Sequence, residues 1–313
     1  MSAQDEHRTQ SGSGPVRLVR VEIDGDVVPG LVVGDEVVEI ETSWNEALAA
    51  LAAGDGASIV PAGSARRVPL ATAVLDMPLE ASGEVYCVGL NYRAHEAEAS
   101  ELVDEVRLVP IIFVKSHRAM TRPADELVLP GAMSEQFDYE VELGVVIGTE
   151  AVDVEPEQAW DHIAGYCVVN DITARDVQKL HQQWHLGKNA PASTPIGPWV
   201  IERDAFPTPP DLEVRMLVNG VEKQRSNTSL LIHDIPKLVS LLSRTTSLQP
   251  GDVIATGTPA GVGFVRQPPE FLADGDVLES VVGGVGTLTN VVRTPRHATA
   301  SHESALESAT ASG

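Results

Sequence analysis

The segment "FDYEVELGVVIG", Phe137 to Gly148, carries two carboxylates inside a run of residues that is otherwise typical of a buried β-strand. Strand side chains point alternately to two faces, so Glu140 and Glu142 share one face while Val141 lies on the other. Two carboxylates this close would repel each other if they were buried. Either this face is solvated, or a divalent cation between the two carboxylates makes burial tolerable.

A third carboxylate stands at the end of another apolar run. In "VVNDIT", Asp171 follows residues that are typical of a second buried strand, where it could converge with the two glutamates. Three carboxylates without a nearby His or Cys suit a hard cation such as Mg2+, Mn2+ or Ca2+ better than zinc.

The segment "GLNYRAHEAEAS" predicts a helix with His95 and Glu98 three residues apart on one face. Glu98 could then orient the imidazole of His95 as a general base for water. The alternative is an ordinary exposed ion pair on a helix surface. The sequence leaves both interpretations open.

Three further features could contribute to an anion site. The segment "GDVIATGTPAGVG" predicts a strand followed by a glycine-rich turn, whose backbone N–H groups and Thr258 hydroxyl could hold a carboxylate, although a plain tight turn has the same pattern. Lysine is rare in this chain, and Lys115 and Lys188 both follow apolar or tight segments. Either could offset charge on a developing anion, while Lys115 also fits a strand-end residue that reaches solvent.

Composition bounds the class of protein. The 313 residues are 43% hydrophobic, carry a formal net charge of -23, and contain no apolar run long enough to suggest a signal peptide or a membrane span. The negative charge argues against nucleic acid and anionic membranes as partners. Cys87 and Cys167 lie in apolar segments and are expected to be free thiols, so the expected compartment is the cytoplasm.

Patterning predicts two folded units between polar tails. Residues 1–14 and 296–313 are rich in small polar residues and are expected to be disordered. Residues 15–75 predict a small β-rich N-terminal domain, and residues 80–295 a larger domain with many short strands and few helices. Strictly alternating strand and helix units are missing, so the expected class is α+β with a mixed β-sandwich or roll.

Seven blocks, taken in order, resemble the catalytic domain of the fumarylacetoacetate hydrolase family across residues 85–292. They begin with "VGLNYRAHEAE", "PIIFVKS", "DYEVELGVVIG" and "GYCVVNDITARDVQ", and end with "LQPGDVIATGTPAGVG". The resemblance implies a mixed β-sandwich roll, a homodimer, and Mg2+ or Mn2+ as the cofactor, with Ca2+ as a possible substitute. It also implies that Glu140, Glu142 and Asp171 hold the ion.

The resemblance extends to the other site residues. It implies catalytic roles for His95, Glu98 and Lys188, and substrate binding by Arg175, Gln178 and Thr258. Lys115 is expected to bind substrate because of its position after an apolar segment, not because of the resemblance. One block departs from the pattern, because Asn189-Ala190-Pro191 stands where relatives commonly have Ser, an aromatic residue and Asp. The aromatic wall of the pocket is therefore in doubt, and Trp184 and Trp199 are the residues that could replace it.

The resulting functional expectation is a metal-dependent hydrolase. It would cleave a carbon–carbon bond of a 2,4-dioxo acid, of the acylpyruvate or fumarylpyruvate type, through a metal-stabilised enolate. The alternatives that use the same metal site are an oxaloacetate-type decarboxylase, a hydroxymuconate-type isomerase, and a lyase or dehydratase acting on a 2-oxo acid. A catalytically silent binding protein is the alternative from another class. The expected partner in every case is a small dioxo or oxo acid.

Overall fold

The structure is a computed structural model that describes residues 14–59, 61, 65–98, 109–180 and 182–295. The two predicted tails, residues 1–14 and 296–313, lie outside the described residues except for Gly14. Among the described residues, no helix is both long and apolar enough to cross a membrane.

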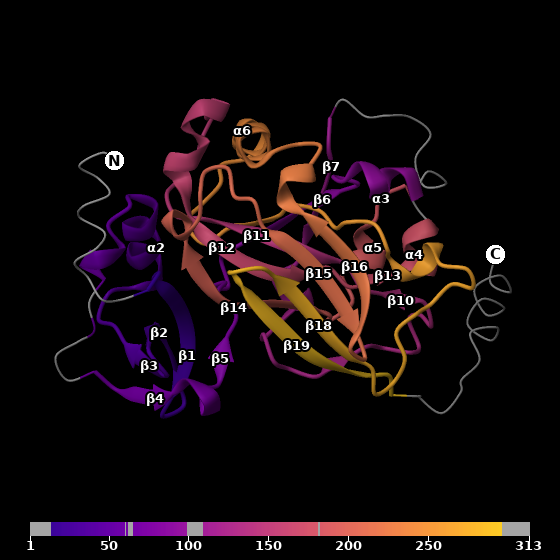
Figure 1. Cartoon of the computed structure of the whole chain (residues 1–313), viewed down its shortest axis with the longest axis horizontal. Coiled ribbons are helices and arrows are strands. Elements are labelled where there is room, and N and C mark those ends of the chain that lie inside the picture. The colour runs from indigo at the N-terminus through magenta and orange to yellow at the C-terminus, as the bar shows by residue number, and fades with distance from the viewer. Residues whose placement is uncertain (1–13, 60, 62–64, 99–108, 181, 296–313) are drawn as a thin grey trace, which may run out of the picture.

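A 12-stranded sheet forms the centre of the fold (Figure 1). Its strands alternate in direction except where β17 runs parallel to β6 and β8 parallel to β14. Along the sheet the order is β4 (Arg67–Pro69), β3 (Glu36–Glu39), β2 (Asp26–Val33), β1 (Arg17–Ile23), β14 (Thr194–Glu202), β12 (Ile163–Asn170), β11 (Val141–Ile147), β17 (Val253–Ala255), β6 (Val85–Gly89) and β7 (Ile111–Lys115), with β5 (Leu75–Asp76) paired to β1 and β8 (Met120–Thr121) to β14.

A second sheet of five strands packs against β11 and β12, and Figure 1 shows it in front of the main sheet. Its order is β16 (Val221–Asn227), β15 (Glu213–Val218), β18 (Val277–Val282), β19 (Gly286–Arg293) and β9 (Leu127–Val128). Val141 and Leu143 of β11 are fully buried against Met216 and Leu288 of this sheet. The packing confirms the predicted mixed β-sandwich in an α+β fold.

The turn between β15 and β16 has the conformation that its sequence predicts. Asn219 and Gly220 both have positive φ angles, 53° and 74°, as a two-residue type I′ hairpin requires. A separate pair of short strands, β10 (Phe137–Asp138) and β13 (Thr173–Ala174), brings the segments before β11 and after β12 together. This pair lies next to the candidate site.

Helices are few and short. Ser43 and Glu46 form a capping box at the start of α2. The α-helices are α2 (Trp44–Ala52), α3 (Arg93–Glu98), α4 (Arg175–Lys179), α5 (His185–Lys188) and α6 (Ile235–Thr245). The 3-10 helices are η1 (Gly56–Ser58), η2 (Leu70–Thr72), η4 (His117–Ala119), η5 (Pro156–His162), η6 (Arg203–Ala205), η7 (Thr228–Leu230) and η8 (Gly263–Val265).

The N-terminal β-rich region is joined to the rest of the protein through the main sheet. In β1, Arg17 pairs with Ile201 of β14 and Leu18 with Val200, so the sheet is continuous from one region to the other. The helix α2 packs in the same apolar cluster as Val146 and Val200. The region is β-rich as predicted, and its division from residues 80–295 as a separate domain stays a prediction.

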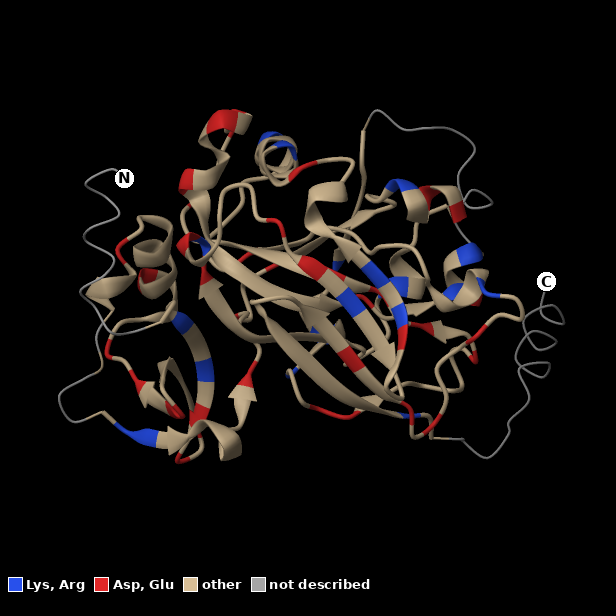
Figure 2. Cartoon of the chain, in the orientation of Figure 1, with Lys and Arg blue, Asp and Glu red and all other residues tan. Residues whose placement is uncertain are grey.

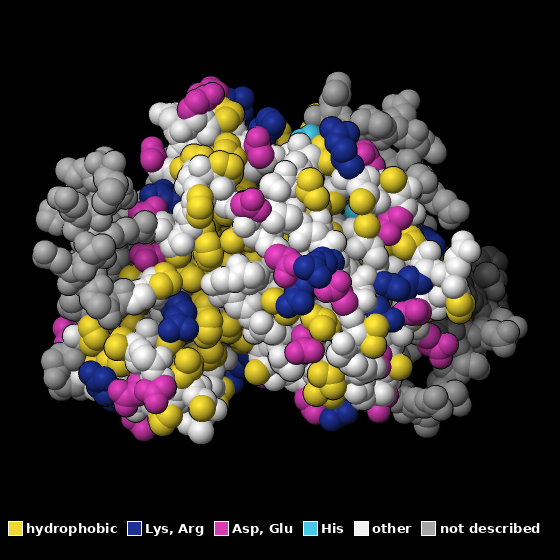
Figure 3. Space-filling model, viewed as in Figure 1, with side chains coloured by type: hydrophobic (Ala, Val, Ile, Leu, Met, Phe, Trp, Pro, Cys, Tyr) yellow, Lys and Arg dark blue, Asp and Glu magenta, His cyan; other side chains and the backbone are white. Residues whose placement is uncertain are grey.

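The outer face of the five-stranded sheet carries charges of both signs. Figure 2 shows Lys or Arg and Asp or Glu side by side on β15 and β16, and Figure 3 shows the same mixed cluster on the surface. Arg215 pairs with Glu213 at 3.1 Å, and Arg225 pairs with Glu213 at 2.6 Å. Exposed pairs of this kind add little to stability, so we do not expect a functional role for this face.

Candidate metal centre and active site

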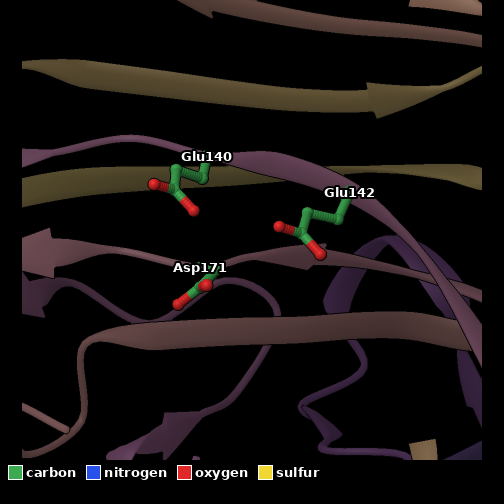
Figure 4. Close-up of side chains that lie close together, drawn as sticks. All are labelled: Glu140, Glu142 and Asp171. Atoms are coloured by element: carbon green, nitrogen blue, oxygen red, sulfur yellow. The ribbon is translucent and has the colours of Figure 1, made fainter. Parts of the chain in front are cut away.

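The antiparallel register of β11 and β12 brings the three predicted carboxylates together. Val141 pairs with Asn170, so Glu140, just before β11, lies beside Asp171, just after β12. The Asp171 N–H donates to the Glu140 carbonyl at 2.8 Å. Figure 4 shows the side chains of Glu140, Glu142 and Asp171 pointing toward one another. One carboxylate oxygen from each lies within 4.8 Å of the others, and all three side chains are buried.

Two of the three carboxylates are neutralised by buried cations. Lys188 Nζ lies 2.7 Å from both Glu140 and Asp171, and Arg175 Nη1 lies 2.7 Å from Glu140. Lys115 Nζ contacts the other oxygen of Asp171 at 2.5 Å. Burial acts to raise the pKa of Glu140, but the positive charges of Lys188 and Arg175 outweigh it and lower this pKa to about 2.

Glu142 is the carboxylate without a cationic partner. Within the described part of the chain, neither Lys nor Arg forms an ion pair with it, and its Oε2 accepts a single hydrogen bond from the Gly257 N–H at 2.8 Å. Burial, followed by the nearby charges of Asp171 and Glu140, raises the pKa of Glu142 well above its usual range. A buried, all-oxygen donor set with one uncompensated carboxylate fits a hard divalent cation.

Arg175 is held by a carboxylate that the sequence analysis did not single out. Its Nε donates to Asp138 at 2.9 Å, and its Nη1 donates to Gln178 at 3.1 Å. Asp138 is fully buried and also accepts the N–H groups of Gly263 at 2.8 Å and Phe264 at 3.1 Å. The Arg175 Nη2 atom is buried and has no hydrogen-bond partner among the described residues, which leaves it available to a ligand.

The predicted dyad on α3 is formed. His95 Nδ1 lies 2.9 Å from Glu98, and both Glu98 oxygens accept the Gly261 N–H at 3.0 Å. An ionised carboxylate only accepts hydrogen bonds, so a neutral His95 beside it would carry its proton on Nδ1 and a lone pair on Nε2. His95 is 4% exposed, so it is not part of an ordinary solvent-exposed pair.

The glycine-rich turn after β17 binds the protein's own carboxylates. The N–H of Gly257 donates to Glu142 and that of Gly261 donates to Glu98, so these two groups are not free for a substrate. The Thr258 hydroxyl donates to the Val141 carbonyl at 3.0 Å and accepts from Gln224 at 2.8 Å. The turn therefore orients Glu142, a candidate metal ligand, and the dyad, and a substrate contact by Thr258 stays a prediction.

One pocket is lined by Glu140 and Glu142 of the triad and by His95 of the dyad. It has a polar side and an apolar side, and Lys115 is not among its lining residues. The lining consists of Val88, Gly89, Leu90, His95, Phe113, Glu140, Glu142, Arg175, Gln178, Trp184, Lys188 and Thr258. Trp184 therefore supplies an aromatic wall, whereas Trp199 lies elsewhere, with its indole N–H donating to the Val285 carbonyl.

The unusual block after Lys188 has a structural role. The Asn189 side chain accepts the Ser116 N–H at 2.6 Å and donates to the Val114 carbonyl at 3.2 Å. These bonds pair its amide with the free edge of β7 as a neighbouring strand would. Asn189 thereby fastens the end of α5, which carries Lys188, to the main sheet.

Comparisons with known proteins agree with this geometry. Residues 84–293 match the family model described as fumarylacetoacetate (FAA) hydrolase C-terminal. The oxaloacetate tautomerase YisK of Bacillus subtilis is 40% identical over 211 residues, which cover 67% of this chain and 70% of that protein.

Two solved structures are similar over nearly the whole chain. The 2-hydroxyhepta-2,4-diene-1,7-dioate isomerase of Mycobacterium marinum is 34% identical with a TM-score of 0.74. The fumarylacetoacetate hydrolase of Exiguobacterium antarcticum is 34% identical with a TM-score of 0.76. Each comparison covers 90% of this chain and 100% of the other chain.

Proposed function

The chain belongs to the fumarylacetoacetate hydrolase family, and from this premise we propose that it is a divalent-metal-dependent enzyme that interconverts the keto and enol forms of a 2-oxo acid. The observation that carries the proposal is a triad of buried carboxylates, of which Glu142 has no cationic partner among the described residues, with Glu140 and Glu142 lining the same pocket as His95. The homodimer and the cytoplasmic location stay predictions.

Glu140, Glu142 and Asp171 would hold the cation, and their oxygen ligands favour Mg2+ or Mn2+. When bound, the ion would act as a Lewis acid that stabilises the negative charge of an enolate. Arg175 has an unpartnered nitrogen for the substrate carboxylate. Lys188 adds a second positive charge on the same side of the pocket.

In this proposal His95 is the group that moves the proton. Its Nδ1 is occupied by Glu98, so its Nε2 is the nitrogen that can remove a proton from the carbon next to the 2-oxo group and return it. Glu98 keeps the imidazole in this tautomer and is itself held by the N–H of Gly261. Enolisation needs no water nucleophile: the proton that His95 takes from the carbon would be delivered to the enolate oxygen to give the enol, and the reverse transfer would restore the keto form.

The names of the relatives favour isomerisation over hydrolysis. One relative is named as a tautomerase of oxaloacetate and one similar structure as an isomerase of a heptadiene dioate. Carbon–carbon bond hydrolysis of a 2,4-dioxo acid is the second candidate, because the same dyad could activate water and one similar structure is named as a fumarylacetoacetate hydrolase.

The test is proton exchange at carbon 3 of a 2-oxo acid. The protein with Mg2+ is incubated in D2O with pyruvate, oxaloacetate or acetylpyruvate, and loss of the carbon-3 proton signal is followed by NMR. We expect exchange that EDTA and Glu140→Ala both abolish. Release of pyruvate from acetylpyruvate, measured by a coupled assay on the same samples, reports hydrolysis.

His95→Ala should slow exchange by about 100- to 10,000-fold, because it removes the base. Glu98→Gln should cause a smaller loss, and Glu96→Gln on the same helix is the matched control, since no described contact ties Glu96 to His95. Metal-dependent exchange that His95→Ala leaves unchanged would exclude the role given to His95. Absence of metal-dependent exchange on all three acids would exclude the tautomerase proposal.

A further inference from the structure

We propose that the pocket contains an apolar subsite, formed by Val88, Leu90, Phe113 and Trp184, that takes an uncharged distal group of the substrate. The inference rests on the proposed function, because it assumes that the polar side of the pocket holds the carboxylate and oxo groups of a 2-oxo acid. The substrate class that follows is a 2-oxo monocarboxylate with an alkyl or aryl end.

The aromatic part of this subsite is preformed. The rings of Phe113 and Trp184 meet edge to face, with centroids 5.6 Å apart and an interplanar angle of 65°. Trp184 lies directly on the backbone of Gly89, where a Cβ atom would come within 2.4 Å of the indole. Glycine at position 89 therefore makes room for the indole, which stands against Phe113.

The apolar wall adjoins the polar side of the pocket. Lys188 Nζ lies 4.9 Å from the centre of the Phe113 ring while it also pairs with Glu140 and Asp171. A small molecule whose carboxylate reaches toward Arg175 would therefore extend its other end along Phe113 and Trp184.

The charges of the site leave no cation for a second substrate carboxylate. Three buried cations, Lys115, Arg175 and Lys188, face four buried carboxylates, Asp138, Glu140, Glu142 and Asp171. A divalent ion would leave one surplus positive charge, and the His95–Glu98 pair adds none to it. One substrate carboxylate can be neutralised, and a second would lie unpaired against an apolar wall.

The experiment measures binding of 2-oxo acids to the Mg2+-loaded protein by calorimetry. The series is pyruvate, 2-oxobutanoate and 2-oxopentanoate, with 2-oxoglutarate as the dicarboxylate of the same carbon number as 2-oxopentanoate. We expect affinity to rise about fourfold for each added methylene group. We also expect 2-oxopentanoate to bind at least about tenfold more tightly than 2-oxoglutarate.

Two variants of Trp184 and one control variant test whether the gain in affinity comes from the apolar subsite. Trp184→Ala should reduce the gain per methylene group to less than about twofold, because it removes most of the wall. Trp184→Arg should favour 2-oxoglutarate over 2-oxopentanoate, because it places a cation in the subsite. Leu186→Ala, on α5 with a side chain that is 54% exposed, should leave the series unchanged.

The inference is overturned if 2-oxoglutarate binds to the wild-type protein as tightly as 2-oxopentanoate, or if Trp184→Ala keeps the full gain per methylene group. If Trp184→Ala does not fold, two results still test the subsite. They are the preference of the wild-type protein between 2-oxopentanoate and 2-oxoglutarate, and the reversal of that preference in Trp184→Arg. If the protein catalyses carbon-3 exchange on pyruvate but its affinity does not rise with added methylene groups, the apolar subsite is excluded while the proposed function stands. Failure of every 2-oxo acid to bind overturns it together with the proposed function.

Discussion

Removing Glu140 or Glu142, two ligands from neighbouring positions, should change the stability of the metal-free protein in opposite directions. Glu140 forms ion pairs with Lys188 and Arg175, so Glu140→Gln removes one of the carboxylate partners of each buried cation and should cost about 3 kcal/mol. Glu142 has no cationic partner among the described residues. Glu142→Gln therefore removes an uncompensated charge and should stabilise the protein by about 1–3 kcal/mol.

These energies convert into measurable melting temperatures. A chain of this size shifts by roughly 2 °C per kcal/mol, so Glu140→Gln should melt about 6 °C lower and Glu142→Gln about 2–6 °C higher than the wild type in EDTA. With Mg2+ at about 100 times its dissociation constant, the wild type should gain about 2.7 kcal/mol. Neither variant should show this gain, because each has lost one of the three ligands.

The stabilising effect of Glu142→Gln should also depend on pH. Because the pKa of Glu142 is raised above its ordinary value of 4.5, the folded protein binds this proton more tightly than the unfolded chain. Stability of the metal-free wild type therefore falls as pH rises above 4.5, and the benefit of the substitution should appear over that range. Thermal melts in EDTA at several pH values measure it. Shifts of the same sign in both variants, or a retained metal response in Glu142→Gln, would refute the reasoning.

Three more outcomes follow from contacts at the site and in the core. Asp138→Asn should raise KM for a 2-oxo acid more than it lowers kcat, because Arg175 loses the carboxylate that orients it. A fall in kcat as large as the rise in KM would contradict this positioning role. Gly261→Ala places a Cβ atom 2.2 Å from the Lys223 carbonyl oxygen, so it should lower the free energy of unfolding by about 2 kcal/mol and reduce turnover. Gly275→Ala has no atom within 4 Å of the added Cβ, so it should destabilise the protein less and keep turnover. Burial raises the pKa of the Cys87 and Cys167 thiols, so a thiol reagent should label both only after unfolding, and rapid labelling of the native protein would show that they are accessible.

The alternation of strand side chains was enough to place Glu140 and Glu142 on one face. The same alternation includes Asp138, which was missed because an aspartate at the start of a strand has no chemistry of its own until Arg175 is placed beside it. Asp171 could be suggested from its position after an apolar run. Its approach to Glu140 depends on the register of β11 and β12, which the local sequence does not specify.

The roles of the two lysines and of the glycine-rich turn depend on tertiary contacts. Lys115 and Lys188 both follow apolar or tight segments, yet the structure places Lys188 between Glu140 and Asp171, and Lys115 against Asp171, away from the pocket lining. The turn resembles an anion site because its N–H groups do bind carboxylates. The carboxylates belong to Glu98 and Glu142, which come from distant parts of the chain.

The pairing of β1 with β14 means that the family match, residues 84–293, ends inside a continuous sheet. A protein cut at this boundary would expose the N–H and carbonyl groups of β14, a largely apolar strand, along the edge that β1 now covers. Unprotected edges of this kind recruit strands from other molecules and promote aggregation. The N-terminal strands cover this edge where Arg17 and Leu18 pair with Ile201 and Val200, so removing them should increase the self-association of residues 84–293.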